Sequence, residues 1–90
     1  LYTLLIDEDR APVSRDGFLD GMTATGIGVG VHYMSVPERP YYQQRFGWKP
    51  SDWPVAMALG RRTVSLPLSA GLSDQDVSDV IAAVRAVLAR

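Results

Sequence analysis

The C-terminal segment 73–90 constrains the fold more than any other part of the chain. Apolar side chains recur there at i, i+3, i+4, i+7, i+10 and i+11, namely at Val77, Val80, Ile81, Val84, Val87 and Leu88. This spacing is typical of a single apolar face on an amphipathic helix. Ser73, followed three positions later by Asp76, resembles a capping box at the helix start. We therefore expect a helix whose apolar face packs against another layer of structure.

The remaining segments predict a small α+β domain. Apolar runs indicate strands at 1–7, 28–34 and 63–68, with Pro67 confining the last strand to an edge or ending it. Further helices are expected from a cap at Ser14 to a stop at Gly26, at 41–46 before Gly47, and at 55–62. The order predicts one domain, residues 1–90, with a small three-stranded sheet and helices packed on one face.

Composition argues against several classes of protein. The net charge is −1 and no basic patch is present, so we expect no nucleic-acid partner. The chain has no cysteine, which excludes disulfides and thiolate metal sites and suits the cytoplasm. No apolar run approaches the roughly 20 residues of a membrane helix, so no membrane partner is expected. The chain begins without methionine and inside a strand pattern, which predicts a fragment of a longer protein.

The usual catalytic motifs are missing from these residues. One histidine, no cysteine and no G-x-S-x-G motif argue against a self-contained hydrolase, and no histidine spacing indicates a metal site. The glycines of 26–30 follow a helix and open a strand, the reverse of a dinucleotide-binding loop. Lys49, the single lysine, lies in a polar, proline-containing loop, where we expect a solvated side chain and not a Schiff base.

Two features could still take part in binding. Strand alternation turns Val29 and Val31 toward the core and His32 toward the opposite face, next to glycines that permit close approach of a ligand. There His32 and Tyr33 could bind a polar ligand or could be ordinary surface or interface residues. The aromatic side chains are concentrated in a stretch that could be internal packing or an interface, namely Tyr41, Tyr42, Phe46, Trp48 and Trp53.

Five short motifs, in register along the chain, resemble the DegT/StrS-type sugar aminotransferases. They are Arg15-Asp16, the GI-x-x-x-x-HY segment from Gly26 to Tyr33, Tyr41-Tyr42 with Phe46-Gly47, Pro54-Val55-Ala56, and the ending Val64-Ser65-Leu66-Pro67-Leu68 with Leu72, Asp76 and Val80. The similarity is greatest to the branch that aminates a 4-keto-pentose sugar nucleotide. One departure is that Pro37-Glu38-Arg39 replaces a histidine that usually follows the proline in the family.

The resemblance implies a homodimeric, pyridoxal-phosphate (PLP) dependent enzyme of the aspartate-aminotransferase fold type. Such enzymes move an amino group from glutamate or glutamine to a nucleotide-linked keto sugar. A large N-terminal domain holds PLP and the catalytic lysine, and this chain would be the small C-terminal domain, inactive and without cofactor on its own. By the same resemblance His32 and Tyr33 contact the sugar nucleotide, and Tyr42 helps to line the same region.

Two other readings remain open at this point. The chain could be a stand-alone α+β module that binds a small ligand, because such folds host many functions. It could also be a protein-interaction fragment whose aromatic stretch binds a partner, which would leave an exposed apolar patch.

Overall fold

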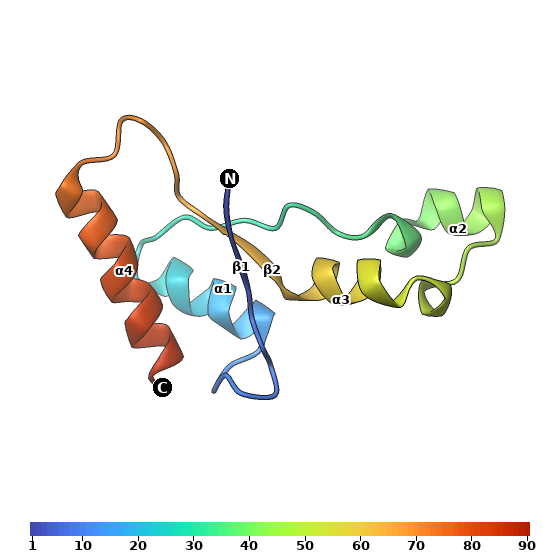
Figure 1. Ribbon diagram of the computed structural model, residues 1–90, viewed down its shortest axis with the longest axis horizontal. Helices are drawn as coiled ribbons and strands as arrows, with labels where there is room; N and C mark the ends of the chain where they lie inside the picture. The colour runs from blue at the N-terminus through green and yellow to red at the C-terminus, as the bar shows by residue number, and fades with distance from the viewer.

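The computed structural model describes residues 1–90, and Figure 1 shows the arrangement of its elements. In chain order these are β1 (Tyr2–Leu5), α1 (Arg15–Ala24), the 3₁₀ turn η1 (Val36–Glu38), α2 (Pro40–Phe46), the 3₁₀ turn η2 (Pro50–Asp52), α3 (Pro54–Arg62), β2 (Thr63–Leu66) and α4 (Asp74–Leu88). The α+β class is confirmed. None of the helices is both long enough and apolar enough to cross a bilayer.

The sheet has two antiparallel strands and two different faces. β1 pairs with β2 so that Leu4 lies opposite Val64 and Thr3 lies opposite Ser65. Because side chains alternate along a strand, the leucine–valine pair shares one face and the threonine–serine pair shares the other. The first face carries the hydrophobic core, and the second carries the groove described below.

The prediction of a strand at 28–34, which would have given the sheet three strands, is wrong. Only Gly30 pairs with the sheet, through two backbone N···O hydrogen bonds to Ser65 of 3.2 and 2.8 Å. The next antiparallel partners along β2 would be Pro67 and Thr63. Pro67 has no N–H to donate, and the N–H of Thr63 already binds the carbonyl of Leu59 at the end of α3. The ladder therefore stops after one bridge.

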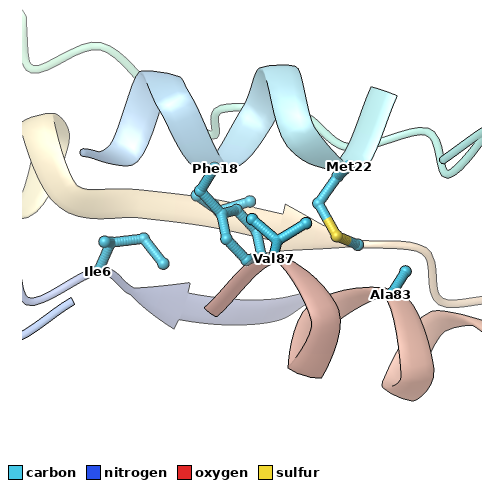
Figure 2. Packing of buried hydrophobic residues seen from close by; sticks show 6 residues of the cluster. Ile6, Phe18, Met22, Ala83 and Val87 are labelled. Carbon is cyan, nitrogen blue, oxygen red and sulfur yellow. The ribbon is translucent and has the colours of Figure 1, made fainter. Parts of the chain in front are cut away.

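The core lies between α1, α4 and the leucine–valine face of the sheet. Its six buried side chains come from four segments of the chain and are drawn in Figure 2: Ile6, Phe18, Met22, Val64, Ala83 and Val87. The two helices approach closely at Gly21, where a Cβ atom would lie 3.0 Å from a methyl group of Val87. The expectation of helices on one face holds for α1 and α4, whereas α2 lies far from the sheet (Figure 1).

The helix ends follow the local sequence signals. Ser14 accepts a hydrogen bond from the N–H of Gly17 at the start of α1, and Ser73 and Asp76 form a reciprocal capping box at the start of α4. Gly26 and Gly47 have φ of +82° and +67° after α1 and α2. Glycine adopts this left-handed conformation without steric cost, so both helices end where the sequence predicts.

Residues 36–53 extend from the domain as an arm. The molecule measures 48 × 30 × 19 Å and has a radius of gyration of 15.3 Å, against about 12 Å for a compact chain of this length. Within the arm α2 packs on η1 and lies at the far end of the long axis in Figure 1. The arm therefore receives little support from the core and depends on its own packing and on its contacts with α3.

Candidate ligand groove

A groove with a volume of about 850 Å³ lies on the sheet face opposite the core. Residues of both strands, of the segment 32–37 and of α3 line it, and two tryptophans, Trp48 and Trp53, add to the lining. The lining side chains are those of Thr3, Leu5, His32, Tyr33, Ser35, Val36, Pro37, Trp48, Trp53, Ala56, Leu59, Gly60 and Thr63. No Asp, Glu, Lys or Arg lines it, so the groove is mostly apolar with a few polar groups, as small-ligand sites often are.

His32 lines the groove and contacts three neighbours, Ser65, Gly30 and Tyr33. Its Nδ1 atom lies 2.8 Å from Oγ of Ser65, within hydrogen-bond distance. Its ring lies over Gly30, where an added Cβ would be 3.3 Å from Cε1. The ring of Tyr33 meets the imidazole edge-on, with 4.8 Å between centroids. The structure therefore brings His32 and Tyr33 together on the same groove, on the sheet face that alternation predicts for His32.

The wall formed by 32–37 is fixed to α3 by backbone contact. An added Cβ at Gly60 would lie 2.9 Å from the backbone nitrogen of Ser35, closer than real Cβ atoms approach. Ser35 is itself buried, and its hydroxyl lies 3.0 Å from the sulfur of Met57 in the same helix. The position of this wall relative to α3 therefore depends on the absence of a side chain at residue 60.

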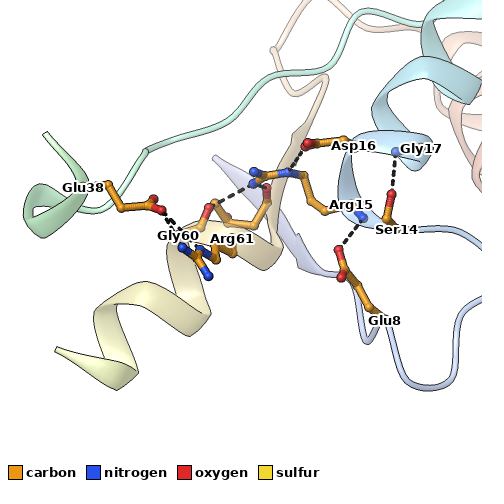
Figure 3. A network of polar contacts seen from close by, with 9 residues as sticks. Glu8, Ser14, Arg15, Asp16, Gly17, Glu38, Gly60 and Arg61 are labelled. Carbon is orange, nitrogen blue, oxygen red and sulfur yellow. Dashed lines mark hydrogen bonds and ion pairs between the residues drawn. The ribbon is translucent and has the colours of Figure 1, made fainter. Parts of the chain in front are cut away.

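Arg15 ties the end of α3 to the start of α1, as Figure 3 shows. Its Nη1 donates to the carbonyl oxygens of Gly60 at 2.9 Å and Thr63 at 3.1 Å, and its Nε pairs with Asp16 at 2.7 Å. The Arg15 side chain is only 15% exposed, and both of these hydrogen bonds are partly buried. Across α3, an ion pair of 3.1 Å joins Arg61 to Glu38 of η1. Both contacts fix helix α3, which forms one wall of the groove.

Tyr42 does not border the groove. Its ring stacks on Trp48 with 5.6 Å between centroids, and Trp48 in turn contacts Trp53 at 5.3 Å. The two tryptophans line the groove, so Tyr42 lies one ring away from it. Sequence reasoning grouped these aromatic residues but did not separate the two that line the groove from the others. It also missed Ser65, which strand alternation places two residues from Thr63 on the groove face.

The groove does not contain the groups that a PLP site needs. Lys49 is exposed, and neither it nor any other cationic side chain lines the groove. A Schiff base to PLP requires a lysine, and its phosphate is usually bound by cations or backbone N–H groups. No cluster of three or more His, Asp or Glu side chains forms a metal site either. These residues therefore do not form a PLP site by themselves.

Comparisons with known proteins give consistent matches over nearly the whole chain. Residues 1–85 match the model of the DegT/DnrJ/EryC1/StrS aminotransferase family. The spore coat polysaccharide biosynthesis protein SpsC of Bacillus subtilis (strain 168) is 45% identical over 89 residues, and the uncharacterized protein MJ1066 of Methanocaldococcus jannaschii is 36% identical over 88. Each alignment covers 98% of this chain and 23% of the relative.

Solved structures give the same result. The Streptococcus pneumoniae protein Spr1654, whose name assigns it provisionally to the sugar aminotransferases, superposes with a TM-score of 0.85 in its PMP form and 0.83 in its PLP form. The sequences are 26% and 25% identical, and each match covers 99% of this chain and 22% of Spr1654. The chain thus spans about a quarter of the length of the proteins it resembles. It belongs to the DegT/DnrJ/EryC1/StrS aminotransferase family.

Proposed function

We propose that this chain is the small C-terminal domain of a longer, PLP-dependent sugar aminotransferase. The full-length enzyme would be a homodimer that moves an amino group from glutamate or glutamine to a nucleotide-linked keto sugar. The observation that carries this proposal is the family match over residues 1–85, together with the likeness to a protein solved in PLP and PMP forms. The name of SpsC, a polysaccharide biosynthesis protein, supports a sugar substrate.

In this proposal the groove contacts the acceptor sugar nucleotide. The faces of Trp48 and Trp53 offer flat apolar surfaces on which a sugar or base ring can pack. His32 would donate a hydrogen bond from Nε2, since Nδ1 is engaged with Ser65, and the hydroxyl of Tyr33 would supply a second polar contact. Without a cation, the groove has no strong partner for a diphosphate, so the phosphates would be bound outside it.

The cofactor would be held by residues outside 1–90. No lysine or cation faces the groove, so the catalytic lysine and the PLP-phosphate site are expected elsewhere in the full-length protein. The part assigned to this chain is limited to binding and orienting the acceptor and excluding water around it. The isolated chain is accordingly expected to be inactive.

The test uses the purified full-length protein with PLP, glutamate or glutamine, and a panel of nucleotide-linked keto sugars. Mass spectrometry would detect the amino sugar, and His32→Ala should raise KM for the acceptor about tenfold, equivalent to about 1.4 kcal/mol for one lost hydrogen bond. Gln44→Ala, at an exposed site on α2, is the control and should leave KM unchanged. Failure of the unmodified protein to aminate any member of the panel would refute the proposal.

A further inference from the structure

Ser65 occupies an unusually well-fixed position next to His32. It is 4% exposed, and both its backbone N–H and its carbonyl are hydrogen-bonded to Gly30. It also lies opposite Thr3 in the ladder, which places its side chain on the groove face. The hydroxyl therefore reaches His32 from a rigid strand in the middle of three paired segments.

Gly30 provides a second contact that fixes the position of the His32 imidazole. A Cβ at residue 30 would lie 3.3 Å from Cε1 and within 4.0 Å of both ring nitrogens, so the ring packs closely against the backbone of Gly30 and a side chain there would crowd it. The imidazole of His32 thus contacts the backbone of Gly30 and, through Nδ1, the hydroxyl of Ser65. No hydrogen bond within the domain engages Nε2, which leaves it available to a ligand in the groove.

We propose that Ser65 is a positioning residue that keeps Nε2–H of His32 available as a hydrogen-bond donor to a groove ligand in both protonation states of the imidazole. The proposal rests on the proposed function, in which His32 contacts the acceptor. The matching ligand atom is an acceptor oxygen, such as a hydroxyl, carbonyl or phosphate oxygen of the sugar nucleotide.

The chemistry follows from the two roles of a hydroxyl group. Nδ1 is the only hydrogen-bond partner of the buried Ser65 hydroxyl, so the hydroxyl proton is satisfied by donating to a neutral, unprotonated Nδ1. The ring proton then lies on Nε2. When the imidazole is protonated, Nδ1–H donates to Oγ and Nε2–H is retained. A carbonyl or carboxylate in the same place can only accept, and would favour the opposite neutral tautomer.

Few charged or titratable side chains lie near His32 that could change the orientation of its ring. Tyr33 is the other titratable side chain that lines the groove, and no Asp, Glu, Lys or Arg does. Thr3 and Thr63, the neighbours of Ser65 on the groove face, are uncharged. The orientation of the ring therefore depends on Ser65 and Gly30 and not on an ion pair.

The experiment compares Ser65→Ala, Ser65→Thr and His32→Gln in the full-length protein. Nitrogen-15 NMR of labelled histidine, with the His32 signals identified by their loss in His32→Gln, should show the Nε2–H tautomer at high pH. Ser65→Ala should shift these signals toward a tautomer mixture and raise KM for the acceptor about fivefold, with less than about twofold change in kcat, as expected for one neutral hydrogen bond. Ser65→Thr, which keeps the hydroxyl, should restore both readouts.

Each outcome has one meaning. An Nδ1–H tautomer in the unmodified protein overturns the proposal, even if Ser65→Ala does not fold. Unchanged KM and signals in Ser65→Ala, with a raised KM in His32→Gln, also overturn it. If the protein makes amino sugars but His32→Gln binds the acceptor normally, the assignment of His32 fails while the proposed function stands. If it makes none, the proposed function fails, and the NMR result still decides the role of Ser65.

Discussion

Replacing Gly60 by alanine should loosen the groove wall from α3. The added Cβ would lie 2.9 Å from the backbone nitrogen of Ser35 and 3.0 Å from its Cβ, whereas ordinary contacts begin near 3.4 Å. Neither neighbour is the end of a flexible side chain, so relief requires movement of the segment 32–37 or of the helix. Arg15 holds the carbonyl of Gly60, so the helix resists that movement.

Two opposing effects set the size of the change. Overpacking against rigid neighbours costs about 1–3 kcal/mol. Alanine within a helix is favoured over glycine by up to about 1 kcal/mol. The balance is a loss of about 1–2 kcal/mol in the local stability of the wall, which corresponds to a roughly 5- to 30-fold larger population of the opened state.

Hydrogen exchange with mass spectrometry on the full-length protein measures this locally. Peptides that cover 32–37 and α3 should exchange about 5- to 30-fold faster in Gly60→Ala, while peptides of α4 should not change. Gly28→Ala is the matched control, because a Cβ there meets no atom within 4 Å and the residue has no positive φ. Exchange in Gly60→Ala as slow as in the unmodified protein would refute the steric argument.

Three further substitutions test the rest of the domain by thermal unfolding. Arg15→Ala leaves the two part-buried carbonyls of Gly60 and Thr63 without their donor and should lower the free energy of unfolding by about 2–3 kcal/mol. Full recovery of stability with Arg15→Lys would contradict a role for the forked guanidinium. Ser73→Ala removes the cap of α4 and should cost about 1 kcal/mol, whereas Ser69→Ala, in an exposed turn, should be neutral. Val87→Ala should cost about 2 kcal/mol because it opens a cavity in the core, and an equal loss in the half-exposed Val77→Ala would contradict that explanation.

The helices could be predicted because their signals are local. The apolar period of α4, the cap at Ser14 and the glycine stops each depend on neighbours a few residues away, and the structure follows them closely. The third strand could not be predicted in this way. Whether 28–34 forms a strand depends on which N–H groups of β2 are free to pair with it. The N–H of Thr63 is not free, because it binds a carbonyl oxygen of α3, and the composition of 28–34 does not show this.

Part of the candidate site follows from alternation and from the family resemblance. Alternation pointed to His32 and the resemblance pointed to His32 and Tyr33. The structure places both side chains on the groove, and their contact with a ligand stays a prediction. Ser65 was missed because its importance comes from pairing with a segment 35 positions earlier in the chain. Tyr42 was placed too near the groove because the sequence does not show how rings stack along an arm.

The direct passage from α3 into β2 has a mechanical consequence. The helix ends at Arg62 and the strand begins at Thr63, with no loop residue between them to serve as a hinge. Tilting the helix would therefore tilt the strand, and with it Val64 in the close-packed interior, which resists deformation. One side of the groove thus behaves as a stiff body continuous with the interior. Adjustment to ligands of different length is therefore expected at Trp48, which lines the groove from the arm.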